Sequence, residues 1–178
     1  FITSSAGAFW ATNDNGASAA LYDFKGQINL PNNYDAFKNP FIMWESFNNT
    51  ASGDSIKFTA TKDYAAGASV TIHSNNNEFP FEYQFVDALP KGGSVMVQDI
   101  ISNKAFYAAG ARVYMSTELL HFTQDGQIDW HQIAEIEGEA QNMAYSGDAN
   151  YLWIGTDEGK LYRVANIATA YDSLLCDI

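Results

Sequence analysis

A strand–turn–strand pattern recurs along this chain, and its spacing limits the folds that the chain can adopt. In the best-formed copy, short strands are predicted at Lys104–Ala108, Arg112–Ser116 and Trp130–Ile136, with tight turns between them. Strands in the same order begin again before and after this copy, at intervals of roughly 40 to 55 residues, the range of four-stranded propeller blades. The sequence therefore predicts an all-β fold, a β-propeller of four-stranded antiparallel blades.

The other strands are predicted from alternation of apolar and polar residues between turn-forming segments. Ile56, Phe58 and Ala60, for example, alternate with Lys57 and Thr59. The remaining predicted strands are Ala8–Thr12, Ala19–Phe24, Gly26–Leu30, Phe41–Phe47, Asp54–Ala60, Ser69–Ser74, Phe81–Val86, Ser94–Asp99, Gln141–Tyr145, Tyr151–Gly155 and Lys160–Val164. The stretch Ala165–Ile178 fits either a fourth strand or a short helix.

Grouped by period, these strands predict one partial propeller over residues 1–178, with blades at 1–31, 41–88, 94–136 and 141–178. About three and a half blades are then present, whereas propellers close with four to eight. A four-bladed ring is the alternative, in which end strands from both termini complete one shared blade. We expect instead that the chain is about half of a larger ring. Its open sheet faces and edges would associate with the remaining blades of the same protein or with a partner chain.

The charge balance narrows the classes of partner. Nine Lys and Arg stand against 21 Asp and Glu, a formal net charge of −12. Such a surface repels nucleic-acid phosphates and anionic lipid headgroups, so neither nucleic-acid binding nor membrane insertion is expected. No run of 18 apolar residues is present, and the single cysteine, Cys176, excludes an internal disulfide. Cations, glycans and proteins remain as ligand classes.

One segment resembles a known family. Thr123, Asp125 and Trp130 keep the spacing of the BNR or Asp-box motif, Ser/Thr-x-Asp-x-Gly-x-x-Trp, of sialidase-like and sortilin-like propellers, although Gly126 comes one residue early. The resemblance implies that this motif lies on the turn between the third and fourth strands of a blade. It also implies that the Asp binds turn amides, that the Trp packs under the turn, and that the role is structural.

The turns between second and third strands hold the candidate ligand residues. Asp14, Asp63 and Asp157 each follow a threonine by one or two residues, and in a propeller these turns gather on one face. Three carboxylates in an arc would bind a hard cation such as Ca²⁺. The alternative is that each Asp bonds the backbone of its own turn. Tyr64, beside Asp63, and Glu158, beside Asp157, are the further candidates for ligand binding, Tyr64 by stacking on a sugar.

No catalytic signature accompanies these candidates. Sialidases use three arginines and a Tyr–Glu pair, and this chain has two arginines, Arg112 and Arg163. We therefore predict a non-enzymatic binding or scaffold module that recognises a protein or glycan, in a secreted or cell-surface protein of bacterial type. The alternative is part of a propeller-type glycan-processing hydrolase or lyase whose catalytic residues lie partly outside this chain.

Overall fold

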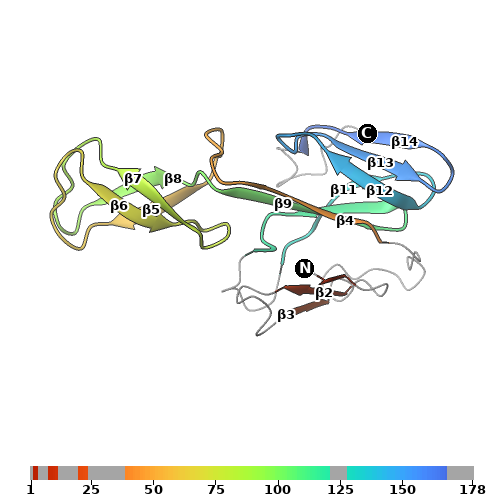
Figure 1. The fold of residues 1–178 in the computed structure, drawn as a ribbon, viewed down its shortest axis with the longest axis horizontal. Coiled ribbons are helices and arrows are strands. Elements are labelled where there is room, and N and C mark those ends of the chain that lie inside the picture. Colours follow the sequence, from red (N-terminus) through yellow and green to blue (C-terminus); the bar gives the residue numbers. More distant parts are fainter. Residues whose placement is uncertain (1, 4–7, 12–19, 24–38, 121–127, 168–178) are drawn as a thin grey trace. The chain divides into compact units, whose positions relative to one another are not determined.

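The computed structural model describes residues 2–3, 8–11, 20–23, 39–120 and 128–167, and side chains from residue 39 onward. The described residues form antiparallel sheets without an α-helix (Figure 1). The strands are β1 (Ile2–Thr3), β2 (Ala8–Ala11), β3 (Ala20–Asp23), β4 (Phe41–Ser46), β5 (Ser55–Thr59), β6 (Ser69–His73), β7 (Pro80–Gln84), β8 (Ser94–Gln98), β9 (Ser102–Ala109), β10 (Arg112–Ser116), β11 (His131–Glu135), β12 (Ala140–Tyr145), β13 (Leu152–Thr156) and β14 (Leu161–Val164).

The all-β prediction is confirmed, and the predicted strands within the described ranges match the observed ones to within about two residues. The predicted strand Gly26–Leu30 lies outside the described residues. No helix in the described ranges is long and apolar enough to cross a membrane. The chain divides into two compact units. We call Phe1–Trp44 with Lys104–Ile178 the sheet unit, and Glu45–Asn103 the hairpin unit.

The sheet unit contains three antiparallel sheets, ordered β1-β2-β3, β11-β10-β9-β4 and β12-β13-β14. In each, strands that neighbour in space also follow one another along the chain, apart from the hairpin unit placed between β4 and β9. A two-residue turn joins β9 to β10, where Gly110 has a φ of 59°. Glycine takes that conformation without the steric cost of a side chain.

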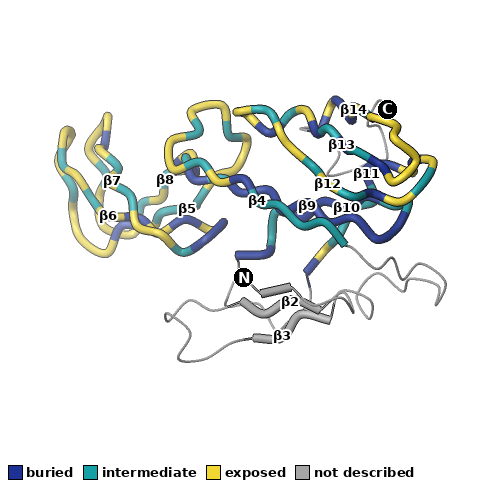
Figure 2. The backbone as a smooth tube through the Cα atoms, turned by 45° about the vertical axis from the view of Figure 1, so that its right-hand side comes forward, coloured by how far each residue is buried: buried dark blue, intermediate teal, exposed yellow. Residues whose placement is uncertain are grey.

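The four-stranded sheet is buried on both faces, and β9 is dark blue along nearly its whole length in Figure 2. One face packs against β12–β14 through an apolar cluster that includes Phe106, Met115, Leu152 and Ile154. The other face carries a second cluster with Tyr107 at its centre. This explains why residues 105–109 of β9 are all apolar and do not alternate with polar residues.

The hairpin unit is one long β-hairpin folded back on itself. Its register runs unchanged from Ser55↔Gln98, through an isolated bridge at Tyr64↔Leu89, to His73↔Pro80. The hairpin bends on both sides of that bridge, so that β5–β8 and β6–β7 are separate two-stranded sheets (Figure 1). Each strand buries one face only, as their alternating sequences indicate.

A buried polar network fastens the hairpin tip to its base. The Asp99 carboxylate, 0% exposed, accepts hydrogen bonds from Ser74 Oγ at 2.8 Å, from the Asn75 backbone N–H at 2.8 Å and from the Ile101 backbone N–H at 3.1 Å. Asn76 Nδ2 donates to the Ile101 carbonyl at 2.7 Å. A buried carboxylate is tolerated where its oxygens are hydrogen-bonded in this way.

This pairing differs from the predicted grouping into blades. The sequence places β5 in the blade at 41–88 and β8 in the blade at 94–136, whereas the two strands are hydrogen-bonded to each other. The first strand of the four-stranded sheet is β4 and not β8. The grouping differs because β5 and β8 pair across a long hairpin, and the spacing of strands along the chain does not indicate which distant strands pair. Within the described residues no closed ring of blades is shown.

Candidate functional site

Asp63 and Asp157 occupy similar positions in two different units. Asp63 Oδ1 accepts a hydrogen bond from the Lys91 backbone N–H at 2.8 Å, and Asp157 Oδ1 accepts one from the Glu139 backbone N–H at 2.8 Å. Both residues are exposed. Each carboxylate therefore bonds the backbone of a neighbouring turn, whereas the alternative to a cation site was a bond to the backbone of its own turn. Asp14 lies outside the described residues.

Gly138 makes room for the Asp157 contact. It has a φ of 79°, and a Cβ built there would stand 2.8 Å from Asp157 Oδ1. Within the described ranges, no three His, Cys, Asp or Glu side chains are grouped to hold a metal ion. The Ca²⁺ site at Asp14, Asp63 and Asp157 stays a prediction.

Tyr64 lies among aromatic side chains of the hairpin unit. Its ring centroid is 4.9 Å from that of Phe85 and 5.8 Å from that of Phe58, and Lys62 Nζ lies 5.4 Å from the ring centre. Its backbone N–H and carbonyl both bond Leu89 across the bend, at 2.9 Å. Tyr64 is therefore partly committed to packing, and it is only half-buried. Whether it stacks on a sugar stays a prediction.

Glu158 belongs to a small charged group at the turn between β13 and β14. Lys160 Nζ forms an ion pair with Glu158 Oε2 at 3.0 Å and a shorter one with Glu137 Oε2. The hydrogen bond with Glu137, followed by that with Glu158, raises the pKa of Lys160, and the same pair lowers the pKa of Glu137. All three side chains are exposed, so solvent screens these pairs.

Trp130 is the one residue of the Asp-box-like segment that the structure describes; Thr123, Asp125 and Gly126 lie outside the described residues. Trp130 packs against the cluster on the second face of the four-stranded sheet, with its ring 6.4 Å from that of Tyr107. Residues 117–130 join β10 to β11, the third and fourth strands in chain order of that sheet.

A second turn with related spacing lies between β12 and β13. Ser146, Asp148 and Trp153 stand at the Ser, Asp and Trp positions of Ser/Thr-x-Asp-x-Gly-x-x-Trp, with Asn150 at the Gly position. Ser146 Oγ donates to Asp148 Oδ1, and the Asn150 backbone N–H donates to both, at 3.2 and 3.1 Å. These bonds, that from Ser146 first, lower the pKa of Asp148. This spacing is visible in the sequence, although the Asp-box resemblance was drawn only for the segment at 123–130.

Lys104 and Trp44 bond the backbone of this second turn through their side chains. Lys104 Nζ donates to the Ala149 carbonyl at 3.1 Å and lies 5.5 Å from the Trp44 ring centre, while Trp44 Nε1 donates to the Gly147 carbonyl at 2.9 Å. Burial lowers the pKa of Lys104, and Asp148 opposes that shift. This inward-pointing lysine is a structural cation, and no sequence pattern distinguishes it from a surface lysine in a strand.

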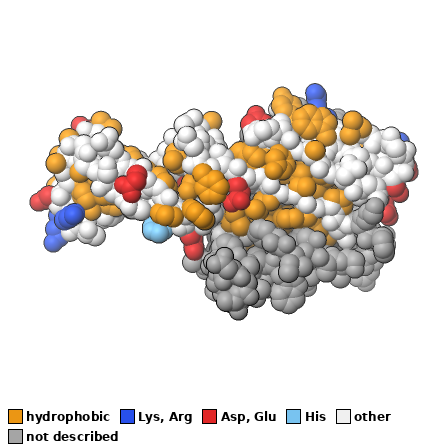
Figure 3. Space-filling model, in the orientation of Figure 1, with side chains coloured by type: hydrophobic (Ala, Val, Ile, Leu, Met, Phe, Trp, Pro, Cys, Tyr) orange, Lys and Arg blue, Asp and Glu red, His pale blue; other side chains and the backbone are white. Residues whose placement is uncertain are grey.

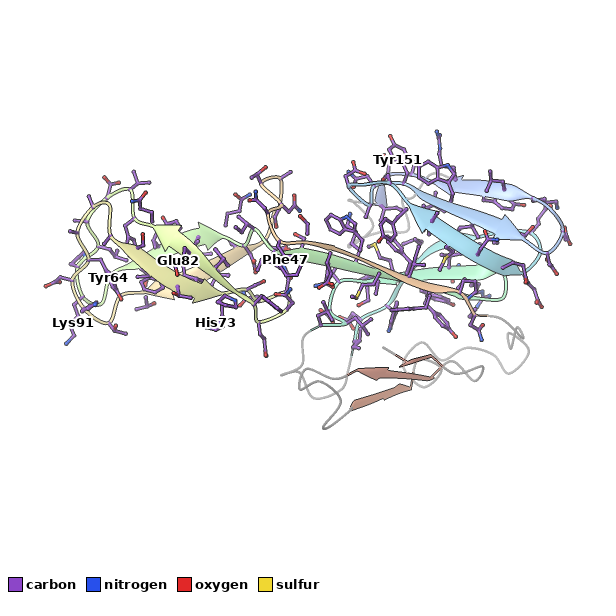
Figure 4. All side chains as sticks on the ribbon, in the orientation of Figure 1. Phe47, Tyr64, His73, Glu82, Lys91 and Tyr151 are labelled. Carbon is purple, nitrogen blue, oxygen red and sulfur yellow. The ribbon has the colours of Figure 1, made fainter. Side chains whose placement is uncertain are left out.

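The hairpin unit also exposes an aromatic pair that sequence reasoning missed. Phe47 and Phe79 are 53% and 55% exposed, and their rings meet edge to face with centroids 5.4 Å apart. Phe47, which is labelled in Figure 4, follows β4. Phe79 lies at the hairpin tip between β6 and β7, next to Glu78, whose carbonyl bonds His73 Nδ1 at 2.9 Å. Figure 3 shows apolar side chains at the surface of this unit. We call these two residues the Phe47–Phe79 pair.

Comparison of the chain with protein-family models, with curated proteins and with solved structures gives no match.

Proposed function

We propose that the chain is a non-enzymatic binding or scaffold module, built on part of a β-propeller and belonging to a secreted or cell-surface protein. The propeller is supported by the sheet unit, whose three antiparallel sheets follow one another along the chain as successive blades do. The four-stranded sheet, with its two buried faces, has the burial of a blade between two neighbours. In this arrangement the hairpin unit is an insertion between the first and second strands of one blade.

The observation that carries the binding function is the Phe47–Phe79 pair on this insertion. Insertions between the strands of a rigid scaffold are the usual place for recognition residues. Two adjacent phenylalanines that are more than half exposed lose apolar contact with water only when a partner covers them. Aromatic anchors of this kind supply much of the affinity of protein interfaces.

A protein ligand fits the Phe47–Phe79 pair better than a glycan does. Phenylalanine has no polar group with which to bond sugar hydroxyls, whereas Tyr and Trp carry one. The net charge of −12 favours a partner with a basic or neutral surface. An extracellular location is part of the proposal and rests on composition and on the Asp-box resemblance.

The hydrolase or lyase alternative has weaker support. The two arginines of the chain already have partners: Arg112 Nε lies 3.9 Å from Glu135 Oε2, and the Arg163 guanidinium lies 5.7 Å from the centre of the Tyr151 ring. Neither contact favours the binding of a substrate carboxylate, so we place the binding module first.

Arrays of secreted and surface proteins and of glycans test the proposal. The labelled chain is compared with a Phe47→Ser/Phe79→Ser variant and with Val86→Ser, which changes an equally apolar residue that is 82% exposed. We expect protein binding that falls at least about tenfold in the double variant and is unchanged in Val86→Ser. If the double variant still binds glycans, recognition depends on residues other than the Phe47–Phe79 pair. Binding to neither array would contradict the proposal.

A further inference from the structure

The sheet β12–β14 has one face in the apolar core and one face in solvent. Met143, Leu152, Ile154 and Val164 point into the core. The register pairs Asn142 with Gly155, Ala144 with Trp153, Trp153 with Arg163 and Gly155 with Leu161, which places these residues on the opposite side. We call that side, together with Tyr151 beside it, the outer face.

The outer face exposes a large aliphatic side chain and aromatic rings to solvent. Leu161 is 74% exposed and Tyr151 41%. The ring of Tyr151, which is labelled in Figure 4, lies 6.1 Å from the ring of Trp153 at an angle of 33°. The Arg163 guanidinium lies 5.7 Å from the Tyr151 ring centre. Where sheets or repeats are stacked, a polar outer surface is what ends the stack. This surface is of the opposite kind.

The strand positions of the outer face contain no carboxylate. Asn142, Ala144, Trp153, Gly155, Leu161 and Arg163 together carry one positive charge, in a chain whose net charge is −12. Two copies of so acidic a chain repel each other over most orientations. If two copies met through this face, no carboxylate at the strand positions of one copy would face a carboxylate at those positions of the other.

We propose that the outer face is a dimer surface on which a second copy of this chain packs sheet against sheet about a two-fold axis. The face is self-complementary because it holds both a guanidinium and aromatic rings, the two halves of a cation–π contact. About a two-fold axis, the guanidinium of each copy can meet the aromatic rings of the other, so the contact forms twice. Two-fold symmetry is the commonest symmetry of homo-oligomers. The same sheet already packs against another sheet through its inner face.

Sedimentation equilibrium of the full chain over a range of concentrations tests the proposal. Wild type is expected to form dimers that tighten as salt rises from about 0.01 M to about 0.15 M, because salt screens the repulsion between the copies and leaves apolar contact intact. Leu161→Glu places a carboxylate on the face at an exposed position and should weaken the dimer at least about tenfold. Val86→Glu makes the same change of charge at an exposed apolar residue of the hairpin unit and serves as the matched control.

Each outcome decides the matter. A chain that remains monomeric at every concentration and salt, or an equal loss in Leu161→Glu and Val86→Glu, overturns the dimer surface. The Phe47→Ser/Phe79→Ser variant should dimerise as wild type does, so that loss of partner binding and loss of dimerisation are measured separately.

Discussion

Replacing Asp99 by Asn removes the hydrogen-bond acceptor that fastens the tip of the hairpin unit to its base. In the native chain the two carboxylate oxygens accept from Ser74 Oγ, from the Asn75 N–H and from the Ile101 N–H. An amide keeps one oxygen for the first two donors. Its NH₂ group then faces the Ile101 N–H, which is a donor and cannot be satisfied.

The expected cost follows from these three bonds. A net hydrogen bond to a charged group contributes about 1.5–3 kcal/mol, and a buried unsatisfied donor costs about 1–3 kcal/mol. The loss is partly offset because the amide is cheaper to bury than a carboxylate. We therefore expect Asp99→Asn to lower the free energy of unfolding of the hairpin unit by about 2 kcal/mol, out of a total of about 5–15 kcal/mol for a typical domain.

Urea denaturation and amide hydrogen exchange measure this effect. Exchange should accelerate at residues 74–79 and 99–101, while β9–β11 in the sheet unit keep their protection. Asp87→Asn, which removes the same charge at an exposed position, is the matched control. An unfolding midpoint equal to that of wild type, with unchanged exchange at the tip, would refute the assignment of Asp99 as the residue that holds the tip.

Three further predictions concern titration and metal. Because burial lowers the pKa of Lys104, the unfolded chain binds more protons than the folded chain between the folded pKa and the ordinary value of 10.5. The free energy of unfolding of wild type should therefore rise with pH in that window relative to that of Lys104→Met. Urea denaturation that gives the same pH dependence for both proteins would contradict this. Because the pKa of Asp148 is lowered from 3.8, its contribution to stability is present above that value and is lost as pH falls through the folded pKa. The higher melting temperature of wild type relative to Asp148→Asn should therefore vanish in acid. A difference that persists there would contradict a role of the Asp148 carboxylate in stabilising the turn. If Asp63 and Asp157 act only on neighbouring turns, the melting temperature should not change between Ca²⁺ and chelator, whereas a rise with Ca²⁺ would support the predicted cation site.

Strand positions could be read from this sequence because they depend on local pattern. The strand Arg112–Ser116 is observed as predicted, and Ser102–Ala109 extends the predicted Lys104–Ala108 by residues at both ends. Strand partners could not be read in the same way. β5 and β8 are about forty residues apart and alternate like any half-buried strand, so their pairing depends on tertiary contacts.

The difference between two kinds of strand was nevertheless present in the sequence. Residues 105–109 of β9 are all apolar, as suits a strand covered on both faces, whereas the four strands of the hairpin unit alternate between more and less buried residues. That contrast separates the two units. The candidate ligand residues were chosen for their place in turns, and the structure gives Asp63 and Asp157 backbone partners that no sequence pattern specifies.

The hairpin unit is an insertion between β4 and β9, which are neighbours in one sheet. β4 and β9 are antiparallel neighbours, so a two-residue Asn-Gly turn can join Ser46 to Ser102 in place of residues 47–101. Amide hydrogen exchange of the shortened chain tests the claim directly. We expect β9–β11 and β12–β14 to keep the protection that they have in the full chain. Uniformly fast exchange across these strands would contradict it.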